Sequence, residues 1–503
     1  MKKSRVIRFF KKLHKWPAII IALIAVLFAA SGIVMNHRGV FSAIDVSRKL
    51  LPGNYSYNNW NLGAVRGSLQ SGNAIFIYGN VGIWKCDRDF QNFSDFNQGF
   101  PPGIDNRKIY ALQEFRNTMF AGTHLGLYKR MITNGAWEKI ELSVKNDRIA
   151  DVSLKGDTLL ILTRDYLFKS NDGNIFQKIQ LPDPVNYKRK TGLFDTFWQL
   201  HSGELFGLTG KLIVDLLGIV TILLSVTGLL HFFFPKIIKQ WKKKGKPFED
   251  VLASKRTNLH WHNMVGYVFV LFLVINTFAG IHLRPPLLIA IASKQVGIIP
   301  GTHLDQPNTW FDKLRRVMWD ATNQRYIFST SEGFFFAEES LQKKLQSANN
   351  QPPVSVMGCN VLEPINKKHL LVGSFSGMFV WNTETGQVND FFSGASYHAP
   401  EGMARPIAAD MASGLVASRE KAYWFDYNRG AIGLNGDQFP DMPEEIRTTS
   451  PMSLWNVSQE IHTGRIFEHL IGGFYILFVP LAGICLIIVL ISGVLIWWMV
   501  YRK

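Results

Sequence analysis

Histidines are the residues of this 503-residue chain whose positions most suggest chemistry. Placing an imidazole at membrane depth costs free energy, so a histidine found there indicates a function. Nine of the thirteen histidines lie near the ends of long apolar runs: His14, His37, His201, His231, His260, His262, His282, His462 and His469. Paired imidazoles at two depths of a helical bundle suit either a metal transporter or b-type haem, whose iron takes two axial histidines. A transporter would add carboxylates or thiolates along its path, and only Asp215 lies inside an apolar run. Haem is favoured, with a divalent-metal carrier as the alternative.

Four apolar runs are long enough to cross a bilayer, which takes about 20 residues. They cover residues 17–35, 212–234, 264–283 and 471–500. The first resembles a signal peptide but exceeds the usual length of its apolar core, so we expect an uncleaved helix. Most of the formal net charge of +17 lies before the first run, between the second and third, and after the fourth. Short basic segments remain in the cytoplasm, so both termini are predicted inside and two long segments outside.

The resulting division alternates membrane helices with outer segments. We expect a cytoplasmic segment at 1–16, a helix at 17–36, an outer β segment at 37–205, a helix at 206–235, a cytoplasmic loop at 236–262, a helix at 263–284, a second outer β segment at 285–465, a helix at 466–500 and a tail at 501–503.

Both outer segments repeat a strand, a glycine turn and a strand that ends in aromatic or apolar residues. These ends fall at residues 84, 128 and 168, and again at 335, 380 and 425. A period of about 40–45 residues is typical of β-propeller blades. The predicted fold class is therefore a membrane protein of the α + β type, with a four-helix bundle and one β-propeller-like domain of about three blades per segment. Two separate β-sandwiches are the alternative, but closing one ring would remove the exposed edges of each half.

Large aromatic side chains recur in these strands. They are Trp84, Tyr128, Trp137, Trp381 and Trp424. Large rings dominate burial in protein cores, so we expect most of them inside the blades. Lining a binding face is the alternative.

The membrane half is an internal duplication. His14 precedes Gly32 by 18 residues, and His262 precedes Gly280 by the same interval. A histidine followed by Ser-Gly or Thr-Gly leads into the second and fourth helices, at His201 and His462. A small residue followed by glycine recurs in all four helices, as Ser31-Gly32, Thr227-Gly228, Ala279-Gly280 and Ser492-Gly493. A four-helix bundle with pseudo-two-fold symmetry follows from this repeat.

Several function classes are excluded by what the chain lacks. Three cysteines (Cys86, Cys359 and Cys485) cannot form a disulfide framework or a cysteine-ligated iron–sulfur cluster. No C-x-x-C-H sequence is present for covalent haem, and no glycine-rich dinucleotide fingerprint. Electrons must then come from a quinol or a separate donor protein. The basic residues gather at the ends of the predicted membrane helices, where the helices leave the lipid bilayer. They are not spread over one surface of a folded domain, so nucleic-acid binding is not expected.

The runs LHKW, LHSGELFGLTGK, WHNMVGY and IHTGRIFEHL resemble the PepSY-associated transmembrane family. That family includes inner-membrane ferric-siderophore reductases, whose four-helix core carries two b haems. The resemblance implies a multi-pass protein of the bacterial inner (cytoplasmic) membrane and a haem-dependent ferric-chelate reductase. It implies two b-type haems as cofactors, and a ferric siderophore or its periplasmic carrier as the partner.

Four histidines match the family motifs: His14, His201, His262 and His462. The duplication pairs His14 with His262 on the cytoplasmic side and His201 with His462 on the outer side. Second-tier haem ligands are His37, His231, His282 and His469. The outer segments show no PepSY αβ unit, so substrate selection is expected in the propeller. The alternative function is a membrane-anchored propeller that acts as a sensor, binding or assembly protein without redox activity.

Overall fold

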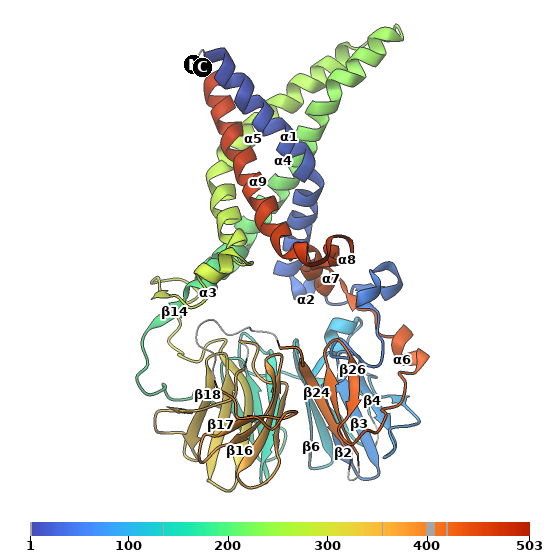
Figure 1. Ribbon diagram of the computed structural model, residues 1–503, viewed down its shortest axis with the longest axis vertical. Helices are drawn as coiled ribbons and strands as arrows, with labels where there is room; N and C mark the ends of the chain where they lie inside the picture. Colours follow the sequence, from blue (N-terminus) through green and yellow to red (C-terminus); the bar gives the residue numbers. More distant parts are fainter. Residues whose placement is uncertain (1–2, 134, 355, 399–407, 419–420, 503) are drawn as a thin grey trace. The chain divides into compact units, whose positions relative to one another are not determined.

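The computed structural model describes residues 3–133, 135–354, 356–398, 408–418 and 421–502 (Figure 1). They form two compact units. One contains Met1–Phe41, Lys188–Asp305 and Leu454–Lys503, and the other contains Ser42–Tyr187 and Gln306–Ser453. Residues 1–2 and 503, which belong to the predicted cytoplasmic segments, lie outside the described part.

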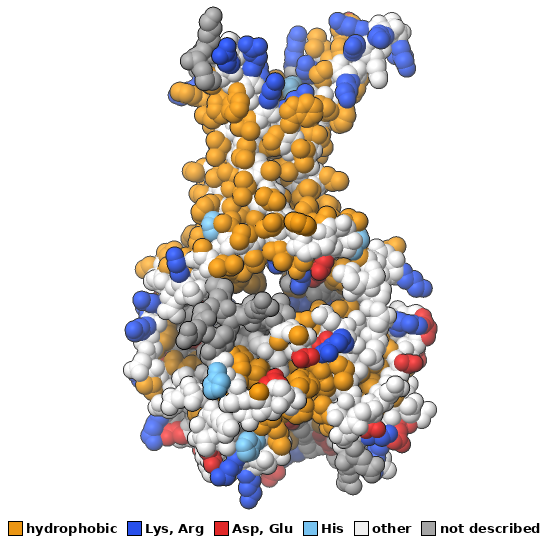
Figure 2. All heavy atoms as spheres, viewed as in Figure 1, with side chains coloured by type: hydrophobic (Ala, Val, Ile, Leu, Met, Phe, Trp, Pro, Cys, Tyr) orange, Lys and Arg blue, Asp and Glu red, His pale blue; other side chains and the backbone are white. Residues whose placement is uncertain are grey.

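The first unit contains four helices that are long and apolar enough to cross a membrane. They are α1 (Lys3–Asn36), α4 (Gly207–Lys243), α5 (Glu249–Ile281) and α9 (Tyr475–Ile496). Each packs against two neighbours in the order α1, α4, α5, α9 and back to α1. Consequently α1 lies diagonally opposite α5, and α4 opposite α9. Figure 2 shows apolar side chains around the bundle and basic side chains at one end. The chain is a multi-pass membrane protein.

The helices extend beyond the apolar runs at the basic end. Helix α1 begins at Lys3 and includes most of the expected segment 1–16, and only residues 244–248 separate α4 from α5, where a loop over 236–262 was expected. Lys, Arg, Gln and Glu are good helix formers, so the chain remains helical where it leaves the apolar zone. We call this the basic end, and the opposite end, where the chain leads to and from the second unit, the linker end.

Two short helices lie within the segments that were expected to be β structure. Helix α3 (Leu193–Ser202) precedes α4, and α7 (Leu454–His462) precedes the last span. Each ends at a glycine in the left-handed conformation, Gly203 (φ 79°) and Gly464 (φ 76°), which is a common helix terminator. The glycines of the two repeated His-Ser/Thr-Gly motifs therefore end the helices that carry His201 and His462. Helix α8 (Glu468–Ile471) follows α7, and α9 begins only at Tyr475 instead of 466.

Two more short helices and two strand pairs complete the connections. They are α2 (Arg38–Phe41), α6 (Glu444–Thr448), the antiparallel pair β1 (Asp45–Val46) with β27 (Met452–Ser453), and the antiparallel pair β14 (Lys190–Gly192) with β15 (Gln295–Gly297).

Among its described residues, the second unit contains six antiparallel sheets of three or four strands, and within each sheet the strands follow one another in sequence order. The first chain segment forms β2 (Gly67–Ser71), β3 (Ala74–Gly79), β4 (Gly82–Cys86) and β5 (Ser94–Asp95); β6 (Ile109–Phe115), β7 (Thr118–Thr123), β8 (Gly126–Met131) and β9 (Glu138–Ile140); and β10 (Ile149–Lys155), β11 (Thr158–Thr163), β12 (Leu167–Ser170) and β13 (Gln177–Ile179). The second forms β16 (Leu314–Asp320), β17 (Arg325–Thr330), β18 (Gly333–Glu338) and β19 (Gln346–Ser347); β20 (Val361–Pro364), β21 (His369–Ser374), β22 (Gly377–Asn382) and β23 (Val388–Asp390); and β24 (Ala412–Ala417), β25 (Ala422–Asp426) and β26 (Gly430–Gly433). We number these sheets as blades 1 to 6.

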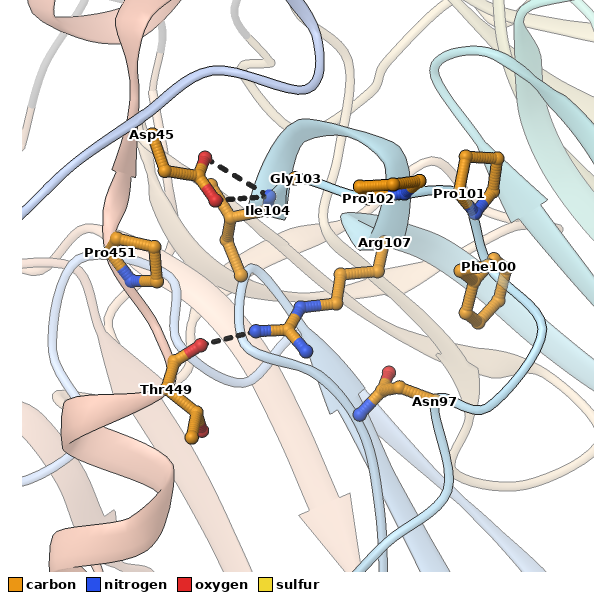
Figure 3. A pocket seen from close by; sticks show the side chains of 10 residues that line it. All are labelled: Asp45, Asn97, Phe100, Pro101, Pro102, Gly103, Ile104, Arg107, Thr449 and Pro451. Atoms are coloured by element: carbon orange, nitrogen blue, oxygen red, sulfur yellow. Dashed lines mark hydrogen bonds between the residues drawn. The ribbon is translucent and has the colours of Figure 1, made fainter.

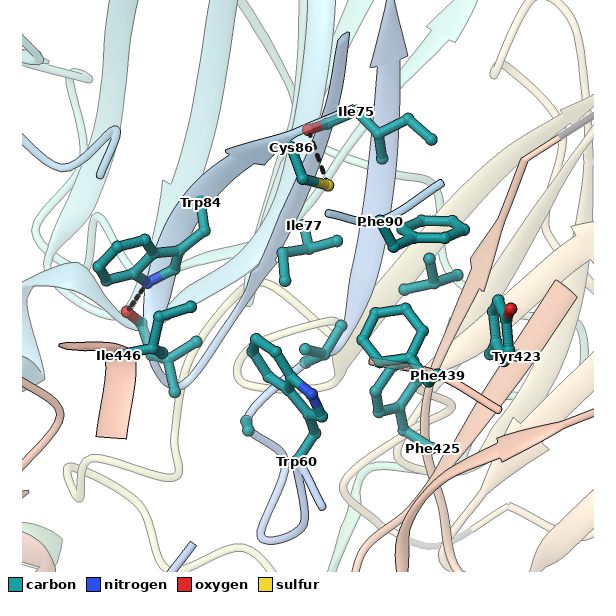
Figure 4. Packing of buried hydrophobic residues seen from close by; sticks show 14 of the residues in the cluster. Trp60, Ile75, Ile77, Trp84, Cys86, Phe90, Tyr423, Phe425, Phe439 and Ile446 are labelled. Atoms are coloured by element: carbon teal, nitrogen blue, oxygen red, sulfur yellow. Dashed lines mark hydrogen bonds between the residues drawn. The ribbon is translucent and has the colours of Figure 1, made fainter. Parts of the chain in front are cut away.

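The six blades close into a ring. A cluster of buried apolar side chains joins each blade to the next, for example Phe76 of blade 1 to Met119 of blade 2. The last cluster joins blade 6 back to blade 1, where Phe425 and Phe439 pack with Trp60 and Ile77 (Figure 4). The unit is therefore one six-bladed β-propeller built from both outer segments, and the alternative of two β-sandwiches is wrong.

The prominent aromatic side chains lie inside this core. Trp84, Trp137 and Trp424 are at most 3% exposed, and so are Tyr128 and Trp381. The alternative in which they line a binding face is wrong. Cys86 and Cys359 are buried free thiols in blades 1 and 5.

The segment before blade 1 seals the ring by pairing with blade 6. The backbone N–H of Leu62 donates to the carbonyl of Tyr427, and that of Ala431 donates to the carbonyl of Asn59. Gly430 (φ 84°) lies so close that an added Cβ would stand 1.7 Å from the Asn59 oxygen. Only glycine fits this contact.

The substitution Gly430→Ala should therefore destabilise the propeller by at least about 2 kcal/mol, because overpacking adds to the strain of a positive φ. Gly436→Ala is the matched control, since Gly436 has a similar φ of 83° but open space around it. Thermal unfolding of the purified protein in detergent measures both. Equal losses in the two variants would show that the backbone contact is not needed.

The two chain segments also meet between blades 3 and 4. The carboxylate of Asp165 accepts a hydrogen bond from the backbone N–H of Asp312 at 2.6 Å, and Arg164 Nε donates to the Asp312 carboxylate at 2.8 Å. Burial raises the pKa of Asp165 to about 6, although the hydrogen bond from Asp312 opposes this. Between about pH 4 and 6, the folded protein keeps a proton on Asp165 that the unfolded chain has already released. The free energy of unfolding therefore falls as pH rises through this range.

Asp165→Asn keeps the acceptor oxygen and cannot ionise. We expect this variant to be more stable than the wild type by about 1–2 kcal/mol at pH 8 and equal to it near pH 4. Thermal unfolding at the two pH values provides the measurement. A stability difference that does not change with pH would contradict the assignment.

Candidate functional site

Two pairs of histidines face each other inside the bundle, at two depths. Near the basic end, His14 of α1 and His262 of α5 have ring centres 6.2 Å apart. Near the linker end, His201 of α3 and His462 of α7 have ring centres 5.8 Å apart, with their Nε2 atoms separated by 3.5 Å. The helices α1 and α5 lie diagonally across the bundle, and α3 and α7 precede the other diagonal pair. The structure thus brings together the histidines that the duplication pairs.

The Nδ1 atom of each histidine is bonded to a neighbouring helix. His14, His201 and His462 have Nδ1 2.9 Å from the carbonyl oxygens of Val489, Asn276 and Phe28. A carbonyl can only accept, so these Nδ1 atoms carry the proton and donate. His262 Nδ1 lies 2.9 Å from Thr227 Oγ1, whose own hydrogen is donated to the carbonyl of Leu223. Each Nε2 is left with its lone pair, the state in which imidazole binds a metal.

Each histidine ring rests on a glycine of a facing helix. A Cβ added at Gly280 would stand 2.6 Å from His201 Cε1, and one at Gly493 would stand 3.0 Å from His14 Cε1. The corresponding distances are 3.2 Å for Gly32 with His462 and 3.5 Å for Gly228 with His262. These four glycines are the ones that recur in the duplicated sequence. Three of the rings bond to a backbone carbonyl, and each of these carbonyls belongs to the residue four positions before the glycine. Because the glycine has no side chain, the ring can come close enough to the helix to reach that carbonyl.

Hydroxyl groups lie beside three of the four rings. Ser31 Oγ is 3.1 Å from His462 Nδ1, Ser492 Oγ is 3.5 Å from His14 Nδ1, and Thr227 supplies the contact to His262 described above. The fourth equivalent position is Ala279. Sequence reasoning noted these small residues as repeats but did not predict that they contact the histidines, since the repeat does not show which helices face each other.

The second-tier histidines have other surroundings. His282 is half-buried and His469 is exposed. Their Nδ1 atoms bond to the backbone carbonyls of Phe278 and Ile466. His231 of α4 has a buried Nδ1 with no protein partner. His37 lies 2.6 Å from the carboxylate of Asp215. None of these four faces another histidine at the distances of the two pairs.

The described residues of the chain contain no group of three His, Cys, Asp or Glu side chains that could hold a metal ion directly. The divalent-metal carrier therefore has no ion site among them.

A small pocket of about 240 Å³ lies in the propeller unit, beside β1 and the loop before blade 2 (Figure 3). Arg107 donates to the carbonyl of Thr449 in this pocket, and both oxygens of Asp45 accept from the backbone N–H of Ile104. Burial raises the pKa of Asp45 and lowers that of Arg107. The volume is below the roughly 300–1,000 Å³ of small-molecule sites, so we do not assign an acceptor site here.

The comparison with protein families extends over both units. The model of the PepSY-associated TM region matches residues 1–234 and 237–499. The chain belongs to this family. The match includes the propeller segments of this PepSY-associated protein as well as its helices. No curated protein matches the chain.

Similar solved structures share little sequence with this PepSY-associated protein. The extracellular domain of BT4673 from B. thetaiotaomicron, described as part of a hybrid two-component system, is 10% identical with a TM-score of 0.37, over 73% of this chain and 32% of that one. The N-terminal domain of Nup159 is 8% identical with a TM-score of 0.31, over 73% and 74% of the two chains. The chain thus spans about a third of the first protein. The propeller is established by its own sheet order and ring closure.

Proposed function

We propose that this protein is a b-type haem oxidoreductase of a bacterial inner membrane, which passes electrons across the bilayer to a ferric chelate. The observation that supports this proposal is the presence of two half-buried histidine pairs, at two depths, whose Nδ1 atoms are already engaged. His14 with His262 would hold one haem, and His201 with His462 the other.

The geometry of the pairs fits a shared metal ion. One metal ion can bind two imidazoles only when their nitrogens with free lone pairs point toward each other. The Nε2 atoms of His201 and His462 are 3.5 Å apart, so this pair meets the condition. The glycines beside the rings also support the proposal, since the absence of a side chain at these positions leaves room for the imidazole rings. Bound haem supplies an iron that carries one electron at a time.

The chain's own residues would set the direction of transfer. The basic end would face the cytoplasm, with both termini, because short basic segments are retained there. The described residues form the helical unit and the propeller and no nicotinamide or flavin domain, so a quinol or a separate protein would supply electrons to the His14–His262 pair. The His201–His462 pair would pass them to a ferric siderophore or to its periplasmic carrier, with the propeller as the docking domain.

Electron transfer can be tested with the purified protein in lipid vesicles that contain a reduced quinol, with a ferric siderophore outside and a colour reagent that traps ferrous iron. We expect ferrous iron to form with the wild type and to be lost with His262→Ala. A protein that retains haem but reduces no ferric chelate would contradict the proposed acceptor. A protein without haem would leave the sensor or assembly function.

A further inference from the structure

Asp215 is an acidic residue within the apolar part of a membrane span, and it has two partners at the end of α1. Its side chain is 12% exposed. One carboxylate oxygen lies 2.6 Å from His37 Nε2, and the other accepts from Asn36 Nδ2 at 3.0 Å. The His37 side chain is 28% exposed, so it connects the buried carboxylate with the surface of the bundle. An ionisable group at this depth is expensive and indicates a function.

The neighbouring charged groups at the linker end have partners of their own. On α2, the guanidinium of Arg38 stacks on the ring of Trp455, and at the start of α4, Lys211 pairs with Glu204 at 3.0 Å. On the other side of the bundle, Arg284 donates to the carbonyl of Thr463, and Arg465 pairs with Glu460. Beside these groups, the His37–Asp215 pair carries one negative charge when His37 is neutral, and none when it is protonated.

This pair lies close to the His201–His462 site. On α1, Asn36 is four residues beyond Gly32, on which the ring of His462 rests, and four residues correspond to about 6 Å along a helix. On α4, Asp215 is three residues before Gly218, which packs against Ile33 of α1. A charge change at one site therefore acts on the other through the protein interior, where water screens little.

We propose that the His37–Asp215 pair would bind a proton more tightly when a haem held by His201 and His462 carries an added electron, and less tightly when that electron has left. This inference rests on the proposed function. At a separation on the order of 10 Å and an effective dielectric constant of about 20, one added charge changes proton binding by about tenfold. The pair would offset part of the added charge and so ease the arrival of the electron.

The step is balanced in protons and electrons. The electron would come from the donor by way of a haem that His14 and His262 would hold. The proton would come from water at the linker end and bind to neutral His37, which would become an imidazolium beside the Asp215 carboxylate. When the electron passes to the ferric chelate, the proton returns to the same water. No proton crosses the membrane.

A redox titration of the purified protein between pH 5 and 9 tests the proposal, with the haem that is absent from His462→Ala assigned to the His201–His462 site. In the wild type, the midpoint potential of this haem should fall by about 59 mV in total as pH rises, which corresponds to the tenfold change in proton binding. His37→Gln should abolish this fall, because the Gln amide can still donate to Asp215 but does not titrate. Asp215→Asn should move the fall to lower pH or remove it.

His282→Gln is the control, since His282 is a half-buried histidine at the same end whose Nδ1 bonds to a backbone carbonyl and not to a carboxylate. This variant should keep the wild-type fall. A potential with the same pH dependence in the wild type and in His37→Gln would overturn the inference while leaving the proposed function intact. A wild-type protein without haem would overturn the proposed function, and this inference with it.

Discussion

His462→Ala should be purified with half of the wild-type haem. Its removal leaves His201 without the imidazole that faces it, and the iron of a b-type haem is held only by its axial ligands. The His14–His262 pair should be unaffected, because it lies at the other depth and has its own anchors in Val489 and Thr227. Haem per protein, measured by the absorbance of the pyridine adduct, should fall from two to one.

Complementary variants check that the loss is specific. His262→Ala should also lose one haem, and the double variant should lose both. The control is His469→Ala. His469 lies seven residues after His462, but its Nδ1 bonds to the backbone carbonyl of Ile466 and its ring faces no other histidine. Loss of haem from this control, or two haems in His462→Ala, would contradict the assigned ligands.

Gly280→Ala should weaken haem retention at the linker end by about 10- to 100-fold. The new methyl group would stand 2.6 Å from His201 Cε1 and 2.8 Å from its Nδ1, so the ring must move away from the carbonyl of Asn276 that orients it. Overpacking of this kind costs about 1–3 kcal/mol, and each 1.4 kcal/mol is a factor of ten in affinity. Haem loss to an excess of a haem-binding acceptor protein measures the effect.

Gly266→Ala is the matched control on the same helix, since its nearest neighbour to an added Cβ is Leu224 at 3.8 Å. This variant should retain haem like the wild type. If both alanine variants lost haem equally, a general disturbance of helix packing would explain the loss, and not the contact between Gly280 and the His201 ring.

The pairing of histidines illustrates what could be predicted from the sequence. The interval of 18 residues between His14 and Gly32 recurs between His262 and Gly280, and this repeat indicates that the two histidines occupy equivalent places. It does not show which glycine each ring contacts. In the structure, His14 rests on Gly493 and His262 on Gly228, both on other helices. Contacts between helices depend on their order around the bundle, which the spacing along one helix does not contain.

The helix boundaries and the role of His37 show the same limit. Apolar runs mark where a chain can lie in lipid, but α1 begins at Lys3 because basic residues also favour helix outside it. His37 was predicted as a second-tier haem ligand, since it lies at a helix end. Its actual neighbour, Asp215, is 178 residues away in the chain, and no pattern links the two residues. By contrast, the propeller was predicted from its period, because each blade repeats the same local strand and turn signals.

An absorbance spectrum of the purified protein, oxidised and then reduced with dithionite, tests the central claim most directly. Two haems in different surroundings should give b-type bands in the reduced state, with about two haems per chain. A spectrum without a haem band, from cells with ample haem supply, would contradict the claim that these histidine pairs hold haem iron.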